Sequence, residues 1–235
     1  SSAASDVYKR QTDALEADKV AGGGVFVHFD NISGKKAEVY VDTEVHNSGK
    51  RTRTVAVETV LVDAGDVPVK RVSQQVKLQA GESKTVRQRF AVRNPKLWSP
   101  DSPYLYRIQS RVKAGHEVLD GGVTRVGIRK AEFKGKDGFW LNGKPFGQLV
   151  GANRHQDFAY VGNALPNSQQ WRDAKRLRDA GCTIIRVAHY PQDPAFMDAC
   201  DEMGLFVIVA TPGWQYWNKN PEFAKLVHRN TRCLL

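Results

Sequence analysis

Apolar and polar residues alternate along the first half of the chain. The clearest run is 37–45, in which every second position is apolar or small: Ala37, Val39, Val41, Thr43 and Val45. The same alternation recurs at 55–61, 86–92 and 104–112, and residues typical of turns separate the runs. Short alternating strands with no helical stretch between them predict an antiparallel, immunoglobulin-like β-sandwich over residues 24–132.

The pattern changes after Phe133. Phe139-Trp140-Leu141 followed by Asn142-Gly143 predicts a small hairpin. Three apolar runs then alternate with segments of helical spacing, and these runs are 149–152, 183–187 and 205–210. Alternating strands and helices predict parallel strands, as at the beginning of an α/β barrel or a doubly wound sheet. Roughly three β/α units fit into residues 133–235, whereas a closed barrel requires eight.

Capping residues mark the two predicted helices between these runs. The expected N-caps are Ser168 and Asp193, and the expected stops are Gly181 and Gly204. The spacing also predicts which side chains face the core: Trp171, Ala174 and Leu177 in the first helix, and Phe196, Met197 and Cys200 in the second.

A short polar cluster follows each of the three apolar runs. The clusters are Asn-Arg-His-Gln-Asp at 153–157, Arg-Val-Ala-His-Tyr-Pro at 186–191 and Thr-Pro-Gly-Trp at 211–214. Ligand-binding residues gather at the carboxyl ends of parallel strands in α/β folds. Three clusters at the same ends of successive strands therefore predict a binding pocket.

Charge and hydropathy exclude several classes of partner. The chain has 235 residues and a formal net charge of +10, which is compatible with nucleic-acid binding. The basic residues, however, alternate with apolar residues along strand-like runs, as on a solvated sheet face, so no nucleic-acid partner is expected. No apolar stretch approaches the roughly 20 residues that span a bilayer, so no membrane span is expected either.

The three cysteines give no sign of a metal site. Cys182 and Cys200 lie in apolar surroundings and are expected to be buried thiols, while no closely spaced Cys/His set is present. We therefore expect neither a metal nor another cofactor.

Both ends of the sequence have features of cloning origin. Residues 1–11 resemble the translated end of a sequencing-library adapter, and Cys233-Leu234-Leu235 resembles its reverse complement, although an apolar strand is the alternative there. Residues 12–23 are interpreted as a linker or the end of a preceding domain. The chain is accordingly expected to be an internal fragment, which leaves its compartment open, the periplasm and secretion included.

Three motifs in the second half of the chain are distinctive: Asn-Gly-Lys-Pro at 142–145, Gly-Ala-Asn-Arg-His at 151–155 and Arg-Val-Ala-His-Tyr-Pro at 186–191. They resemble segments of glycoside hydrolase family 2, which contains β-galactosidases, β-glucuronidases and β-mannosidases. The first two resemble the start of its catalytic barrel, and the third resembles its Arg-x-Ser-His-Tyr-Pro segment with Ala188 in place of Ser. Residues 97–106 and 125–129 are similar to the end of its sandwich domain. The resemblance implies an immunoglobulin-like sandwich followed by the first part of a TIM (β/α)8 barrel.

The resemblance also implies roles for individual residues. His155 and His189 would hold sugar hydroxyls, and Arg186 would keep a nucleophilic glutamate ionised, because a guanidinium does not lose its charge. Asp157 and Arg154 are further substrate-binding candidates, although a polar loop residue is the plain alternative for Asp157. Trp214 is expected to form an aromatic wall for one face of a sugar.

The family's two catalytic carboxylates are expected beyond Leu235, so no catalytic residue is assigned within the chain. The magnesium-dependent β-galactosidases carry acidic residues where Val209, Ala210 and Trp214 stand here, so the resemblance implies no magnesium at this place.

The expected function is that of a fragment of a retaining glycosidase that hydrolyses terminal β-linked sugars, most similar to β-galactosidases. β-Glucuronidase and β-mannosidase are the alternatives within the family, and a non-catalytic carbohydrate-binding or adhesion module is the alternative of another class. The expected partner is a β-linked glycoside or oligosaccharide, and the oligomeric state of the full-length protein is left open.

Overall fold

The computed structural model describes residues 24–211 and 218–234. It divides into two compact units. The first contains the described residues up to Leu97 together with Leu105–Lys130, and the second contains Trp98–Tyr104 and the described residues from Ala131 onward.

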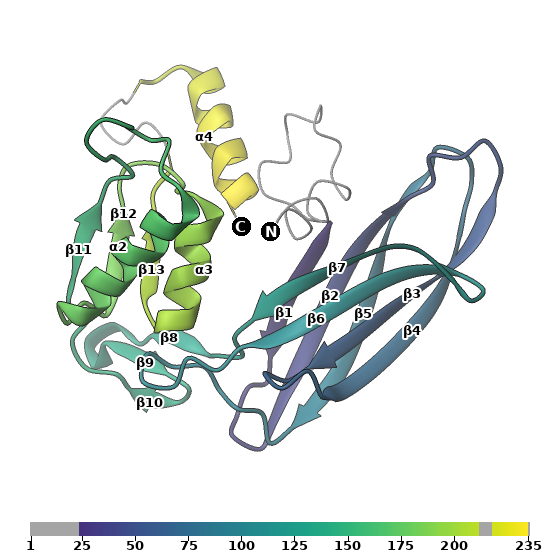
Figure 1. The fold of residues 1–235 in the computed structure, drawn as a ribbon, viewed down its shortest axis with the longest axis horizontal. Coiled ribbons are helices and arrows are strands. Elements are labelled where there is room, and N and C mark those ends of the chain that lie inside the picture. The colour runs from purple at the N-terminus through teal and green to yellow at the C-terminus, as the bar shows by residue number, and fades with distance from the viewer. Residues whose placement is uncertain (1–23, 212–217, 235) are drawn as a thin grey trace. The chain divides into compact units, whose positions relative to one another are not determined.

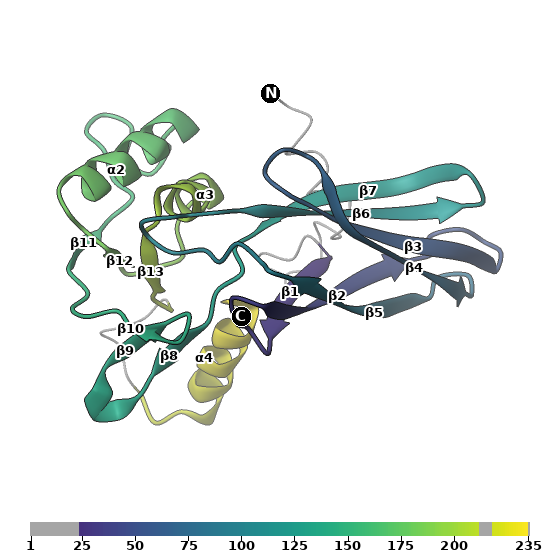
Figure 2. The same ribbon diagram turned by 90° about the horizontal axis from the view of Figure 1, so that it is seen from below.

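The first unit is a sandwich of two antiparallel sheets, seen as two layers in Figure 2. One sheet has the order β1-β2-β5, with β1 at Val25–Asp30, β2 at Lys36–His46 and β5 at Ser83–Arg93. The other has the order β4-β3-β6-β7, with β3 at Arg53–Val62, β4 at Pro68–Leu78, β6 at Tyr106–Ala114 and β7 at Glu117–Val126. These strands confirm the predicted sandwich.

Alternation along the strands builds the core of the sandwich. Ala37, Val39 and Val41 of β2 are completely buried, as the period of two predicts. A polar pair crosses this core: the Thr59 hydroxyl on β3 donates to Oε1 of Gln88 on β5 at 2.5 Å, and Nε2 of Gln88 donates to the Val57 carbonyl at 2.9 Å. Because both groups are buried and paired, they join the two sheets without leaving an unsatisfied polar atom.

The second unit begins with a small antiparallel sheet of order β10-β9-β8. Its strands are β8 (Ala131–Phe133), β9 (Phe139–Leu141) and β10 (Lys144–Pro145), and the 3-10 helix η1 (Gly135–Asp137) joins the first two. Asn142 and Gly143 form the turn between β9 and β10 with φ of 53° and 80°. Positive φ at both central residues is what Asn-Gly accommodates well, and the predicted hairpin is confirmed.

A parallel sheet of order β11-β12-β13 follows. The strands are β11 (Gly151–Arg154), β12 (Ile184–Val187) and β13 (Phe206–Val209), and they alternate with α2 (Asn167–Asp179) and α3 (Pro194–Met203). A last helix, α4, covers Pro221–Leu234, so Cys233 and Leu234 belong to a helix and not to a strand. This strand–helix alternation is the predicted opening of an α/β barrel, and the described strands do not close into one (Figure 1).

Both helices α2 and α3 pack on the same face of this sheet. The shared core contains Ile185 and Val187 from β12, Ala174 from α2, and Phe196 and Ala199 from α3, all completely buried. Trp171, Leu177 and Met197 pack against the same cluster, as their helical spacing predicts. The other face of the sheet carries Asn153, Arg186 and Ile208, which are paired neighbours in the strand register.

The predicted helix ends are confirmed for α3 but not for the start of α2. Asp193 caps α3 by accepting from the Ala195 N–H at 2.8 Å, and Gly204 ends it with φ of 74°. Ser168 is not an N-cap, because α2 already begins at Asn167, where the Pro166 carbonyl accepts the first helical N–H groups. Ser168 therefore lies inside the first turn.

The segment Trp98–Tyr104, expected to end the sandwich, packs within the second unit. Its Trp98 ring is 1% exposed and makes edge contacts with Phe206, and its Nε1 donates to the Asp201 carbonyl at 2.8 Å. Gly204 lies so close to Pro100 that an added Cβ would come within 2.2 Å of the Pro100 carbonyl oxygen. The segment and the hairpin thus close the amino-terminal end of the parallel sheet, opposite the end where the polar clusters lie.

Candidate active site

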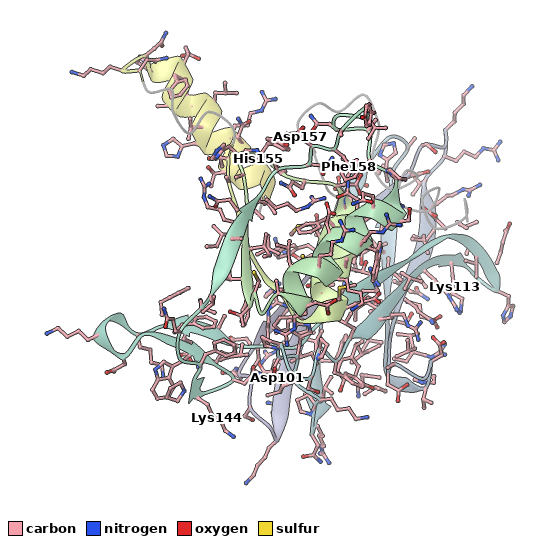
Figure 3. The ribbon with its side chains drawn as sticks, turned by 60° about the vertical axis from the view of Figure 1, so that its left-hand side comes forward. Asp101, Lys113, Lys144, His155, Asp157 and Phe158 are labelled. Atoms are coloured by element: carbon pink, nitrogen blue, oxygen red, sulfur yellow. The ribbon has the colours of Figure 1, made fainter. Side chains whose placement is uncertain are left out.

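The strand register brings the first two polar clusters together. Asn153 on β11 pairs with Arg186 on β12, and Arg154 pairs with Val187 at the next position. Because the two parallel strands end at the same level, the loops that follow them begin side by side. Figure 3 shows His155, Asp157 and Phe158 together beyond the end of β11, at the opposite end of the second unit from Lys144.

Two histidines face each other across these loops. The rings of His155 and His189 have centroids 5.2 Å apart and an interplanar angle of 76°. His155 is exposed and His189 is half-buried. Nη1 of Arg186 lies 3.2 Å from Nδ1 of His189, so the guanidinium and both imidazoles form one cluster at the strand ends.

Burial and charge together determine the protonation of His189. Partial burial lowers the pKa of His189 below its usual value, and the positive charge of Arg186 and the neighbouring His155 ring lower it further. Arginine only donates hydrogen bonds, so Nδ1 of His189 is the acceptor and the neutral ring carries its proton on Nε2. His189 can therefore present one N–H donor to a ligand hydroxyl.

Asp157 lies in the loop after β11 and is exposed. With the amide of Asn163 in the orientation that satisfies both of its polar groups, its nitrogen donates to the Asp157 carboxylate and to the Gln156 carbonyl. The Phe158 N–H donates to the Gly162 carbonyl at 3.1 Å, and the Gly162 N–H donates back to the Phe158 carbonyl at 2.9 Å. These bonds fold the loop into a compact turn that presents Asp157 beside His155 in Figure 3.

Arg154 lies in a different environment from the one expected for a substrate-binding residue. It shares its register position with the buried Val187, so its side chain leaves the sheet on the helix-covered face, opposite Arg186. Arg154 is only 6% exposed, and its guanidinium donates to Gln170, Asp173 and Gln192 at 2.5–2.8 Å. It also lies 4.0 Å from the centroid of the Phe196 ring.

Sequence reasoning missed the residues that join the two loops. Gln156 and Tyr190 stand inside the predicted polar clusters, and Gln192 follows directly after the second one. Their positions beside the histidines were a usable signal, but the partner of an amide side chain cannot be read from a single sequence. Trp214, the remaining candidate, lies outside the described residues.

Within the described residues, the structure has neither a group of side chains that could hold a metal ion nor a membrane-spanning helix. Between residues 24 and 211 and between 218 and 234, no group of three or more His, Cys, Asp or Glu side chains could hold a metal ion. Across the same residues, none of the helices combines the length and the apolar character needed to cross a membrane.

Sequence-family models match almost the whole described chain. The model of "Glycosyl hydrolases family 2" matches residues 24–129, and that of "Glycosyl hydrolases family 2, TIM barrel domain" matches residues 132–231. The chain belongs to glycosyl hydrolase family 2. The resemblance seen in the motifs is thereby confirmed, and so is the order of a sandwich domain followed by the start of a TIM-barrel domain.

Individual members of family 2 give the same result. A β-galactosidase of Thermoanaerobacter pseudethanolicus is 36% identical over 82% of this chain and 25% of its own length. A putative β-glucuronidase of Formosa agariphila is 33% identical over 85% of this chain and 24% of its own length. The structure of β-glucuronidase 2 from Bacteroides uniformis superposes with a TM-score of 0.85 and 28% identity, over 91% of this chain and 26% of that one. The chain thus spans about a quarter of the length of the family members it matches.

Proposed function

We propose that the chain is part of a retaining β-glycosidase that releases terminal β-linked sugars, with a β-galactosidase-like specificity. The observation that carries the proposal is the cluster of His155, His189 and Arg186 at the carboxyl ends of β11 and β12. Its support is twofold: the cluster lies at the strand ends where α/β barrels bind ligands, and the family model covers the same residues.

The cluster is suited to the chemistry of a sugar ring. A glycoside in the reacting subsite presents hydroxyls and develops positive charge at the ring, so it needs directed hydrogen bonds from rigid groups. A neutral His189 donates one such bond through Nε2, and His155 offers a second imidazole 5.2 Å away between ring centroids. Arg186 supplies the permanent positive charge that keeps a neighbouring carboxylate ionised.

In this proposal, both catalytic carboxylates come from barrel strands beyond Leu235. Retaining glycosidases hold their two carboxyl groups about 5–5.5 Å apart, flanking the scissile bond. The 235-residue chain by itself is then expected to bind sugar weakly and to hydrolyse nothing. Asp157 is retained as a substrate contact, and Trp214 as an aromatic wall.

The experiment below distinguishes this proposal from three alternatives. β-Glucuronidase activity is favoured by the similarity to the Formosa agariphila and Bacteroides uniformis proteins, which carry that name. β-Mannosidase activity is the third specificity implied by the motifs. A non-catalytic sugar-binding module is disfavoured, because such a module has no need of histidines and an arginine at barrel strand ends.

The test is to express the complete gene and to measure hydrolysis of nitrophenyl β-galactoside, β-glucuronide and β-mannoside. We expect the galactoside to have the highest kcat/KM and proton NMR to show that the first product keeps the β configuration. Turnover with inversion would reject the retaining mechanism. Sugar binding without any turnover would favour the non-catalytic module, and preference for another of the three substrates would correct the specificity.

A further inference from the structure

We propose that Arg154, Gln156, Tyr190 and Gln192 form a loop clamp that positions the His155–His189 pair. The clamp is a set of hydrogen bonds that join the last residue of β11 and the loop after it to the loop after β12. In the clamp Arg154 is a positioning residue, in place of the substrate contact expected from the motif. The inference deepens the proposed function and rests on it, because His155 and His189 are taken to hold the substrate.

Gln192 binds Arg154 through both ends of its amide. Nη1 of Arg154 donates to Oε1 of Gln192 at 2.5 Å, and Nε2 of Gln192 donates to the Arg154 main-chain carbonyl at 2.7 Å. The same carbonyl accepts from the Ala188 N–H at 2.9 Å. Both side chains are more than nine-tenths buried, so water competes little for these bonds. The residue before His155 is thereby joined to residues on both sides of His189.

Gln156 makes the complementary connection. Its Oε1 accepts from the Asp193 N–H at 2.7 Å, and its main-chain N–H donates to the Tyr190 hydroxyl at 3.1 Å. His155 therefore lies between Arg154 and Gln156, both bonded to the second loop. His189 likewise lies between Ala188, which bonds Arg154 at the end of β11, and Tyr190, which bonds Gln156 in the loop that follows. Each histidine has its two chain neighbours fixed to the segment that carries the other histidine.

Residues of α2 and α3 hold the Arg154 side chain of the clamp in place. Nη2 of Arg154 donates to Gln170 at 2.7 Å and to Asp173 at 2.8 Å, both on α2, and its guanidinium lies over the Phe196 ring on α3. A buried charge with these partners cannot leave its place without losing several charge-assisted bonds at once. The position of the strand end is thus tied to the rigid core of the second unit rather than to solvent-exposed loop atoms.

This arrangement explains how an exposed pair of imidazoles can be held in one geometry. His155 is exposed and His189 is only half-buried, so packing on the rings themselves restrains them little. Catalytic groups must be held close to their productive positions, because an error of about 1 Å costs up to a hundredfold in rate. The clamp supplies that restraint through the main chain on both sides of each ring.

The test compares Gln192→Leu with Gln169→Leu in the full-length enzyme. Gln169 is a buried amide of α2 whose side chain bonds Arg172 and Oδ1 of Asp173, whereas Arg154 bonds the other oxygen of Asp173, Oδ2. It bonds neither histidine loop through its side chain, so it is the matched control for the loss of a buried amide beside the Arg154 network. Tyr190→Phe is the milder second variant, because it keeps the ring and removes only the hydroxyl bond to Gln156. For each protein we would measure kcat, KM and melting temperature, and determine the crystal structure.

We expect Gln192→Leu to lower kcat about tenfold to a hundredfold with little change in KM. Tyr190→Phe should lower kcat about twofold to tenfold, the equivalent of one hydrogen bond. In both crystal structures the two imidazoles should move apart or become disordered, whereas in Gln169→Leu they should keep their positions and the enzyme its kcat.

Three results would overturn the clamp. Unchanged ring positions and kcat in a folded Gln192→Leu protein would do so. So would equal losses in Gln192→Leu and Gln169→Leu that follow the fall in melting temperature, because the amides would then be merely structural. If Gln192→Leu does not fold, the test passes to Tyr190→Phe. The clamp is then rejected if Tyr190→Phe keeps the wild-type kcat and the wild-type ring positions. A wild-type enzyme without glycosidase activity would reject the proposed function, while the ring positions in the variants would still test the clamp.

Discussion

The two units use buried polar groups in opposite ways. In the sandwich, the buried charged side chains are carboxylates whose partners are cations on long, partly exposed side chains: Glu58 is 7% exposed and pairs with Arg71 at 2.9 Å and Lys113 at 3.3 Å. In the second unit, the buried charge is the cation of Arg154, and its side-chain partners are the amides of Gln192 and Gln170 and the carboxylate of Asp173.

This difference separates stability from positioning. Long lysine and arginine side chains around a carboxylate can rearrange, so they add some stability but define no geometry. A buried guanidinium bonded to an amide on the loop after β12 and to an amide and a carboxylate on α2 fixes the positions of both. We therefore expect polar substitutions in the sandwich to change stability alone, and those at the strand ends of the second unit to change catalysis.

The largest expected effect concerns Trp98, a residue near the end of the sandwich sequence whose side chain packs within the second unit. Trp98→Ala removes a completely buried ring that packs on Phe206, so it should cost roughly 3–5 kcal/mol of stability. The loss should be confined to the second unit. Hydrogen exchange of the 235-residue chain would check this by faster exchange in α3 and β13 with unchanged protection in β2 and β3.

Trp140→Ala is a matched control, because Trp140 is only half-buried and lies on the adjacent hairpin. It should change exchange much less. Equal loss of protection in both units of Trp98→Ala would contradict the assignment of Trp98–Tyr104 to the second unit.

Arg186→Ala and His189→Ala should damage catalysis and leave stability almost unchanged. In the proposed function, each removes a group that contacts the reacting sugar or its nucleophile most strongly in the transition state, and such a contact is worth about 10²–10³ in rate. The measurement is kcat/KM together with melting temperature in the full-length enzyme. Near-normal turnover with a sharply lowered melting temperature would make both residues structural and remove them from the site.

In the sandwich, a polar substitution is expected to lower stability and leave catalysis unchanged. Thr59→Val leaves Gln88 with a buried, unpaired amide oxygen while keeping the shape of the side chain, which should cost about 1–3 kcal/mol. Urea unfolding should show the loss, and kcat/KM should stay at the wild-type value. A fall in kcat/KM without a loss of stability would break the division between the two units.

The sequence was most informative where local physics decides the structure. Period-two alternation predicted β2, β3 and β5, and Asp193 and Gly204 predicted both ends of α3, because apolar spacing and caps act over a few residues. Strand β4 escaped detection because nearly all its side chains are exposed, so no apolar alternation marks it. Its place is set by pairing with β3, which is a long-range interaction.

The candidate site was predictable only in part for the same reason. The polar clusters located the strand ends, and the parallel register brought the two histidines together. The environment of Arg154 could not be foreseen, because strand alternation decides its face only once the register and the covering helices are known. The amides that hold it come from α2 and from the loop after β12, and side-chain pairing over such distances leaves no mark in one sequence.

The smallest effect expected is a pH dependence of stability that comes from the sandwich. Hydrogen bonds from Lys36, Asn31 and Arg89 lower the pKa of Glu38 from 4.5 to about 2 in the folded protein. The folded-state pKa lies below the unfolded one, so Glu38 adds stability above pH 4.5 and loses that contribution as the pH falls toward 2. The pKa of Glu58 is also lowered, because its bonds to Arg71 and Lys113 outweigh the opposing effect of burial, so it adds to the same dependence.

Glu38→Gln should flatten the decline of melting temperature between pH 4.5 and 2, whereas Glu117→Gln, which removes an exposed carboxylate of the same sandwich, should leave the slope as it is. Identical slopes for wild type and Glu38→Gln would mean that the cations around Glu38 do not favour its charged form. In that case the contrast with the Arg154 network would be sharper still, because the exposed cations that pair with Glu38 would contribute nothing measurable.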